Sequence, residues 1–120
     1  MTATLYHYPG CDTCRKARKW LKTHAAELEV ELVHLVEAPP DVETLRSLHA
    51  RSGQPLRRFF NTSGGSYRSG GFKERLAAMS EQEQLEALAA DGMLIKRPVL
   101  DLGEVVLVGF AESDWAAAVG

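Results

Sequence analysis

Cys11 and Cys14 are the two cysteines of this 120-residue chain, and only two residues separate them. Cysteines at this spacing can close an intramolecular disulfide or supply half of a zinc site. A zinc site would need further ligands, and the four histidines of the chain show no fixed ligand spacing. We therefore expect redox chemistry and no metal. The plainer alternative is that Cys14 is a small core residue and Cys11 an exposed free thiol.

The position of the pair along the chain gives the two thiols different roles. Residues 4–8 are rich in β-formers and are followed by Pro9-Gly10, and a helical pattern then begins near Asp12 or Thr13. Unpaired amides at a helix N-terminus favour a thiolate over a thiol. This context predicts Cys11 as the nucleophile and Cys14, one turn further on and less exposed, as the resolving thiol.

Two basic residues of the next turn, Arg15 and Lys16, strengthen this expectation. A free thiol has a pKa of about 8.5, and a helix N-terminus with nearby cations lowers it to roughly 3.5–7.5. We expect both side chains to stabilise the Cys11 thiolate or to bind substrate. The remaining basic residues of the same helix are most simply a solvated face.

The elements around the pair predict one α/β domain over residues 1–120. The pattern is a strand, a helix and a strand, then several helices, then two strands joined near Gly103 and a short helix around Trp115. The predicted strands are 4–8, 30–36, 99–102 and 104–110. A right-handed β-α-β start followed by a hairpin gives a four-stranded mixed sheet flanked by helices, the thioredoxin-like architecture, with residues 41–92 as a helical insertion.

In the first part of this insertion, single residues mark where helices are expected to begin and end. Asp41 is placed to cap a helix that ends before Gly53, and a short helix follows from Pro55 to Phe60. Residues 61–71 are rich in Gly and Ser, which predicts a loop.

A second capped helix is predicted in the later part of the insertion. Ser80 and Glu83 have the spacing of a capping box, and Gly92 is placed as the stop of the helix that follows.

The segment before the hairpin carries the second set of candidate residues. In a thioredoxin-like fold, a proline at the position of Pro98 lies opposite the reactive cysteine and often has a cis peptide bond. Arg97 would then point toward Cys11, where a guanidinium can stabilise a thiolate or hold an oxyanion. From periodicity alone, Arg97 would instead be a solvated surface residue.

Composition narrows the classes of function. A formal net charge of −2 argues against direct nucleic-acid binding, which requires a basic face. No run approaches the roughly 20 apolar residues that cross a bilayer, so no membrane partner is expected. Residues 1–8 have no basic region or apolar run typical of a signal peptide, which predicts a cytoplasmic protein with reduced thiols.

Four segments together resemble the arsenate-reductase-like (ArsC/Spx) family, in the right order over nearly the whole chain. They are Tyr8-Pro9-Gly10-Cys11-Asp12-Thr13-Cys14-Arg15-Lys16-Ala17, Phe59-Phe60-Asn61-Thr62-Ser63-Gly64, Asp91-Gly92-Met93-Leu94-Ile95-Lys96-Arg97-Pro98 and Val108-Gly109-Phe110. The second segment looks most like a group of small, largely uncharacterised members thought to be thiol reductases.

The resemblance implies three alternative functions. The first is a thiol-disulfide oxidoreductase that uses the Cys-x-x-Cys pair. The second is an Spx-like regulator, in which the pair is a redox switch, Arg97 responds to it, and Gly53 matches a glycine at the surface that contacts RNA polymerase. The third is an arsenate reductase, but this chain departs from that group at two arginines. Phe59 replaces the arginine expected before Asn61, with Arg58 adjacent, and residues 105–108 lack the arginine expected on the last strand.

The same resemblance implies the partners. No tightly bound cofactor is expected; glutathione with glutaredoxin, or thioredoxin, would restore the dithiol. For the regulator alternative, the partner would be the C-terminal domain of the RNA polymerase α subunit. We expect Cys11, Cys14 and Arg97 to be catalytic, and Arg15, Lys16, Arg58 and Pro98 to bind substrate or stabilise the thiolate.

Overall fold

The computed structural model describes residues 2–119. Its centre is a four-stranded sheet in the order β2-β1-β3-β4, in which β1 pairs with β2 in parallel and the other pairs are antiparallel. The strands are β1 Thr2–His7, β2 Glu29–His34, β3 Val99–Asp101 and β4 Val106–Val108. This is the mixed thioredoxin-like sheet that the sequence predicts.

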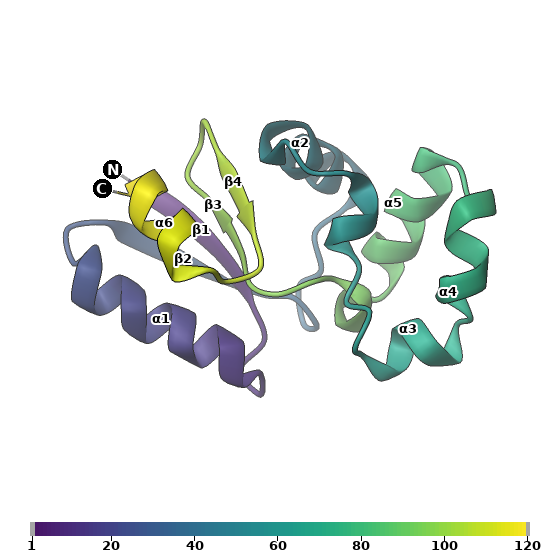
Figure 1. The fold of residues 1–120 in the computed structure, drawn as a ribbon, viewed down its shortest axis with the longest axis horizontal. Helices are drawn as coiled ribbons and strands as arrows, with labels where there is room; N and C mark the ends of the chain where they lie inside the picture. Colours follow the sequence, from purple (N-terminus) through teal and green to yellow (C-terminus); the bar gives the residue numbers. More distant parts are fainter. Residues whose placement is uncertain (1, 120) are drawn as a thin grey trace.

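Helices flank this sheet and fill the long segment between β2 and β3. In Figure 1, α1 and α6 lie beside the sheet, whereas α3, α4 and α5 extend away from it along the long axis of the molecule. The helices are α1 Asp12–His24, α2 Val42–Ser52, α3 Gly65–Ser69, α4 Phe72–Arg75, α5 Glu81–Ala90 and α6 Glu112–Val119. Three short 3-10 turns are η1 Leu56–Phe59, η2 Leu76–Ala78 and η3 Gly92–Leu94.

The two faces of the sheet bury two separate hydrophobic cores. Leu5 packs with Trp20 and Trp115 against α1 and α6, whereas Tyr6 packs with Leu45 and the rest of the helical segment. Neighbouring residues of a strand point to opposite faces, which explains this alternation along β1. The strand that leads to Cys11 is therefore fixed from both sides.

Three of the predicted helix ends are confirmed by side-chain contacts or backbone geometry. The Asp41 carboxylate accepts a hydrogen bond from the Thr44 amide at 2.8 Å, and Gly53 ends α2 with a φ of 68°. At the start of α5, the Glu83 amide donates to Ser80 Oγ at 3.1 Å and the Ser80 amide donates to Glu83 Oε1 at 2.8 Å. These signals act within one turn, so the sequence suffices to predict them.

The prediction of a loop over residues 61–71 is wrong, because this stretch contains α3. The Tyr67 ring lies 6.5 Å from the Phe60 ring and 6.1 Å from the Phe72 ring, between centroids. The helix is short and rich in glycine and serine, so its own propensity is low. Packing of Tyr67 onto the two phenylalanines accounts for it instead.

The role predicted for Gly92 is also wrong. Helix α5 ends at Ala90, and Gly92 begins the next 3-10 turn. A Cβ atom on Gly92 would lie 1.8 Å from the carbonyl oxygen of Leu35. The glycine is required here by the close approach of two backbone segments.

Several predicted boundaries shift by a few residues; β1 spans Thr2–His7 rather than 4–8, and β4 spans Val106–Val108 rather than 104–110. The cap of α1 is Cys11 itself rather than Asp12 or Thr13, and Asp12 pairs with Arg15. Strand β2 ends at His34, because the His34 ring nitrogen Nδ1 accepts hydrogen bonds from the Val36 and Glu37 amides and the chain turns.

Candidate active site

Cys11 sits in the turn that joins β1 to α1. Its amide donates to the Tyr8 carbonyl at 3.0 Å, and its carbonyl accepts the Arg15 amide at 3.1 Å. Its φ and ψ of −93° and 120° are extended, as expected at the cap position of a helix. The side chain is partly exposed. The turn therefore presents one accessible thiol in front of the first amides of α1.

The surroundings of Cys11 favour its thiolate. Partial burial opposes ionisation, but hydrogen bonds from the Cys14 amide, the Cys14 thiol and the Arg97 guanidinium outweigh it and lower the pKa of Cys11. The positive charge of Arg97 acts in the same direction. Each donor prefers a charged acceptor, which is why together they shift the equilibrium.

Cys14 has the opposite character. It is fully buried on the inner side of α1, and this burial raises its pKa to about 12. The Tyr8 amide and the charge of Arg97 lower it, whereas the hydrogen bond to Cys11 and the charge on that thiolate raise it. Cys14 is thus the proton donor of the reduced pair.

Arg97 reaches the cysteines from the far end of the chain. It precedes β3 and forms a cis peptide bond with Pro98. Its Nη1 donates to the Met93 carbonyl at 3.3 Å, and its guanidinium carbon lies 5.3 Å from the centre of the Tyr8 ring. The structure thus brings Cys11, Cys14, Arg97 and the adjoining Pro98 to one end of the sheet.

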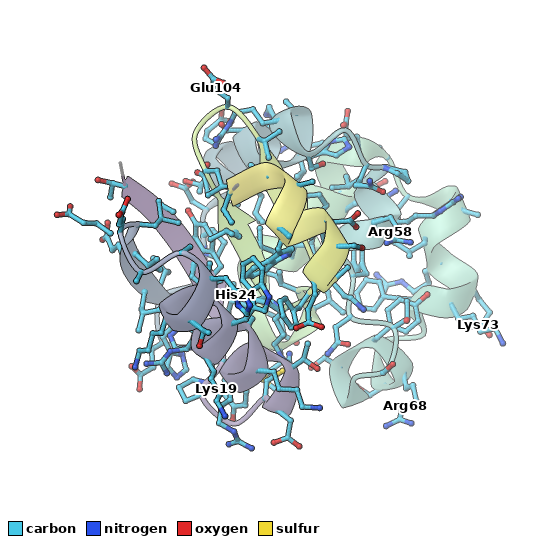
Figure 2. The ribbon with its side chains drawn as sticks, turned by 60° about the vertical axis from the view of Figure 1, so that its left-hand side comes forward. Lys19, His24, Arg58, Arg68, Lys73 and Glu104 are labelled. Carbon is cyan, nitrogen blue, oxygen red and sulfur yellow. The ribbon has the colours of Figure 1, made fainter. Side chains whose placement is uncertain are left out.

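Within residues 2–119, the side-chain contacts formed by the other predicted residues are not with the two thiols. Arg15 pairs with Asp12 and donates to the Pro9 carbonyl at 3.3 Å, and Lys16 is exposed on α1. Arg58 is exposed on η1 beside β4 and α6. In Figure 2 the labelled Arg58 lies on the opposite side of α6 from His24. Roles for Arg15, Lys16 and Arg58 in the chemistry stay predictions.

Three contacts of the site were not predicted from the sequence. Met93 holds Arg97 through its backbone carbonyl, so its side-chain type carries no signal. The Tyr8 amide faces Cys14, and the Tyr8 ring faces Arg97, but an aromatic residue at a strand end is usually read as core. His7 is only 6% exposed; its burial, together with the charges of Arg18 and His34, lowers its pKa.

Neither a metal site nor a membrane span is found in residues 2–119. No three metal-ligating side chains come together there. None of the helices described is long and apolar enough to cross a bilayer.

Comparison with known proteins agrees with this geometry. The model of the ArsC family matches residues 6–118. The uncharacterized protein YusI of Bacillus subtilis is 53% identical over 96% of both chains. The crystal structure of an ArsC-family-related protein of Bacteroides fragilis superposes with a TM-score of 0.93, at 38% identity, over 100% of this chain and 98% of that one.

More distant relatives have two different kinds of function. The global transcriptional regulator Spx of Enterococcus faecalis is 28% identical, over 92% of this chain and 81% of its own. The arsenate reductase of Rhizobium meliloti is 29% identical, over 82% of this chain and 67% of its own. The family match extends from β1 to α6 and includes both cysteines and Arg97, and this chain belongs to the ArsC family.

Proposed function

We propose that this protein is a thiol-disulfide oxidoreductase in which Cys11 attacks and Cys14 resolves. The asymmetry of the pair supports this proposal. One thiol is accessible with a lowered pKa, and the other is buried with a pKa of about 12 and hydrogen bonds to the first. A nucleophile must be both ionised and reachable, and only Cys11 combines the two.

The reaction proceeds in two exchanges. The Cys11 thiolate attacks one sulfur of a disulfide substrate, which forms a mixed disulfide on Cys11 and releases the other half as a thiolate. The Cys14 thiol then loses its proton and attacks the Cys11 sulfur, which releases the second half and closes the Cys11–Cys14 disulfide. Two electrons pass from the protein to the substrate.

Release of the Cys14 proton is easier in the mixed disulfide than in the reduced protein. In the reduced protein, the negative charge on Cys11 and the hydrogen bond to it both raise the pKa of Cys14. Both disappear once Cys11 is covalently occupied, while the Tyr8 amide and Arg97 still favour the Cys14 thiolate. The buried thiol is therefore activated only after substrate has bound covalently.

Restoration of the dithiol needs two electrons from glutathione with glutaredoxin, or from thioredoxin. The test is NADPH-coupled turnover with each reductant in turn, using a glutathione mixed disulfide and arsenate as substrates. Turnover that is lost in Cys11→Ser supports the enzyme and identifies its reductant. A reversible Cys11–Cys14 disulfide without turnover above that blank would refute the enzymatic function.

A second candidate is an Spx-like regulator that binds the C-terminal domain of the RNA polymerase α subunit. The observation in its favour is the likeness to Spx over most of the chain. A switch requires only that the oxidised and reduced forms differ in affinity for the partner. Capture of that polymerase domain by one redox form, and not by the other, would favour the regulator.

Arsenate reduction is the third candidate and rests on the likeness to the Rhizobium meliloti enzyme. Oxyanion binding in proteins commonly uses paired hydrogen bonds from several cations. The Arg97 guanidinium lowers the pKa of Cys11, and Arg58 lies beside β4 and α6. The arsenate arm of the turnover experiment tests this candidate directly.

A further inference from the structure

The ring of Tyr8 lies between the site and the rest of the sheet. One of its faces meets the Arg97 guanidinium, with 5.3 Å from the guanidinium carbon to the ring centre. The ring also meets His34 at a centroid distance of 5.6 Å and an interplanar angle of 89°. Tyr8 thus contacts both His34, at the end of β2, and Arg97, the arginine that lowers the pKa of Cys11.

His34 and Gly10 define the space that the ring occupies. The His34 ring is itself anchored, since its Nδ1 accepts the Val36 and Glu37 amides at 3.2 and 3.0 Å. On another side lies Gly10, where an added Cβ would stand 2.8 Å from Cε2 of the Tyr8 ring. Glycine at position 10 therefore leaves the space that the ring occupies.

Arg97 has few other fixed contacts. Its Nη1 bonds the Met93 carbonyl at 3.3 Å, and its buried Nε has no hydrogen-bond partner among the residues that the structure describes. A guanidinium over an aromatic face is attracted by the negative face of the ring, most strongly when water is excluded. The Tyr8 ring and the Met93 carbonyl thus determine where the guanidinium lies relative to Cys11.

We infer that Tyr8 is a positioning residue, whose ring seats the Arg97 guanidinium against the Cys11 sulfur. The use of this positioning in catalysis rests on the proposed function, because a fixed guanidinium keeps the nucleophile ionised during exchange. The test below measures only the ionisation of Cys11, so it does not depend on that function. The charged or titratable groups near this contact are Cys11, Cys14, Arg97, His34, His7 and the Asp12–Arg15 pair.

The experiment measures the rate of Cys11 alkylation by iodoacetamide as a function of pH in the full chain. Tyr8→Leu removes the ring face and is expected to raise the apparent pKa of Cys11 by about half a unit, which lowers the thiolate fraction roughly threefold below that pKa. Tyr8→Phe keeps the ring and is expected to retain the parent profile. His24→Leu, which removes an aromatic stack on Trp20 at the other end of α1, is the matched control.

The double variant separates positioning from a direct effect of the ring. In the Arg97→Ala background, Tyr8→Leu should cause no further shift, because the guanidinium that it seats is gone. Circular dichroism checks that each variant is folded. If Tyr8→Leu does not fold, Gly10→Ala takes its place, since the added methyl group must displace the ring and should shift the profile in the same direction.

Several outcomes would overturn the inference. They are an unchanged profile in a folded Tyr8→Leu or Gly10→Ala protein, an equal shift in Tyr8→Phe, and full additivity with Arg97→Ala. None of these outcomes depends on turnover. A protein that fails as an oxidoreductase can therefore still confirm or refute the role of Tyr8.

Discussion

Arg51 of α2 and Asp101 of β3 form a two-pronged ion pair between the helical segment and the sheet. Nη1 lies 2.5 Å from Oδ1 and Nη2 lies 3.1 Å from Oδ2. Arg51 also donates to the Gly103 carbonyl at 2.7 Å, and Asp101 accepts the Gly103 amide at 2.8 Å. The pair thus fixes the hairpin turn and docks α2 beside it.

Removal of this pair should destabilise the fold. Arg51→Met leaves Asp101, which is 19% exposed, without its partner, and we expect a loss of about 1–3 kcal/mol in the free energy of unfolding. The control is Arg46→Met on the same helix, whose exposed contacts with Glu43 and Gln82 should together contribute less than about 1 kcal/mol. Urea unfolding at pH 7 measures both, and equal losses would contradict the prediction.

The same pair should make stability depend on pH at the acid end. Burial raises the pKa of Asp101. The Arg51 hydrogen bond, the Gly103 amide and the Arg51 charge together lower it by more than burial raises it, so the net pKa is lowered. A lowered folded-state pKa stabilises the fold above the unfolded value of about 3.9, and this stabilisation is lost as pH falls through the folded value. Urea midpoints below pH 4 should therefore fall less steeply in Asp101→Asn than in the parent.

Arg97→Ala should raise the apparent pKa of Cys11, since the variant loses both a hydrogen bond to the thiolate and a positive charge beside it. The profile of alkylation rate against pH measures this shift. Lys22→Ala, which removes one positive charge near the other end of α1, is the control for net charge. An unchanged profile in Arg97→Ala would remove this residue from the site.

Arg15→Ala should shift the pKa of Cys11 less than Arg97→Ala does. The Arg15 guanidinium pairs with Asp12 and donates to the Pro9 carbonyl, so its charge is largely compensated. The same alkylation profile gives the comparison. A shift as large as that of Arg97→Ala would show that the basic face of α1, rather than one arginine, controls the thiolate.

Cys14→Ser should trap the mixed disulfide. With oxidised glutathione, Cys11 of this variant should keep one glutathione, whereas the parent releases it and loses two hydrogens as the internal disulfide closes. Intact-protein mass spectrometry distinguishes the two products, and Cys11→Ser should take up no glutathione. A glutathione adduct that persists equally in the parent would show that Cys14 does not resolve it.

Much of the local structure follows from the sequence alone. Asp41 and Gly53 delimit α2, and Ser80 with Glu83 begins α5, because each signal acts between backbone and side-chain groups less than one turn apart. The alternation of strands and helices likewise predicts the mixed sheet. The cysteine spacing next to a strand end predicts a reactive pair for the same reason, since it depends on one turn and one helix start.

Other features depend on residues that are distant in the chain. Gly92 looks like a helix stop, and only the approach of the Leu35 carbonyl shows why a side chain is excluded there. Helix α3 lies in a stretch of weak helix formers, and the packing of Tyr67 onto Phe60 and Phe72 accounts for it.

The same division applies to the site. The sequence by itself placed Cys11 just ahead of the helix and Cys14 one turn inside it, although the helix cap is Cys11 itself rather than the predicted Asp12 or Thr13. Only the tertiary structure decided that the Arg97 guanidinium, over the Tyr8 ring and bonded to the Met93 carbonyl, lowers the pKa of Cys11, whereas Arg15 turns toward Asp12. The physical reason is that a cap acts through neighbouring backbone groups, but a guanidinium acts through whatever the fold places within hydrogen-bond reach.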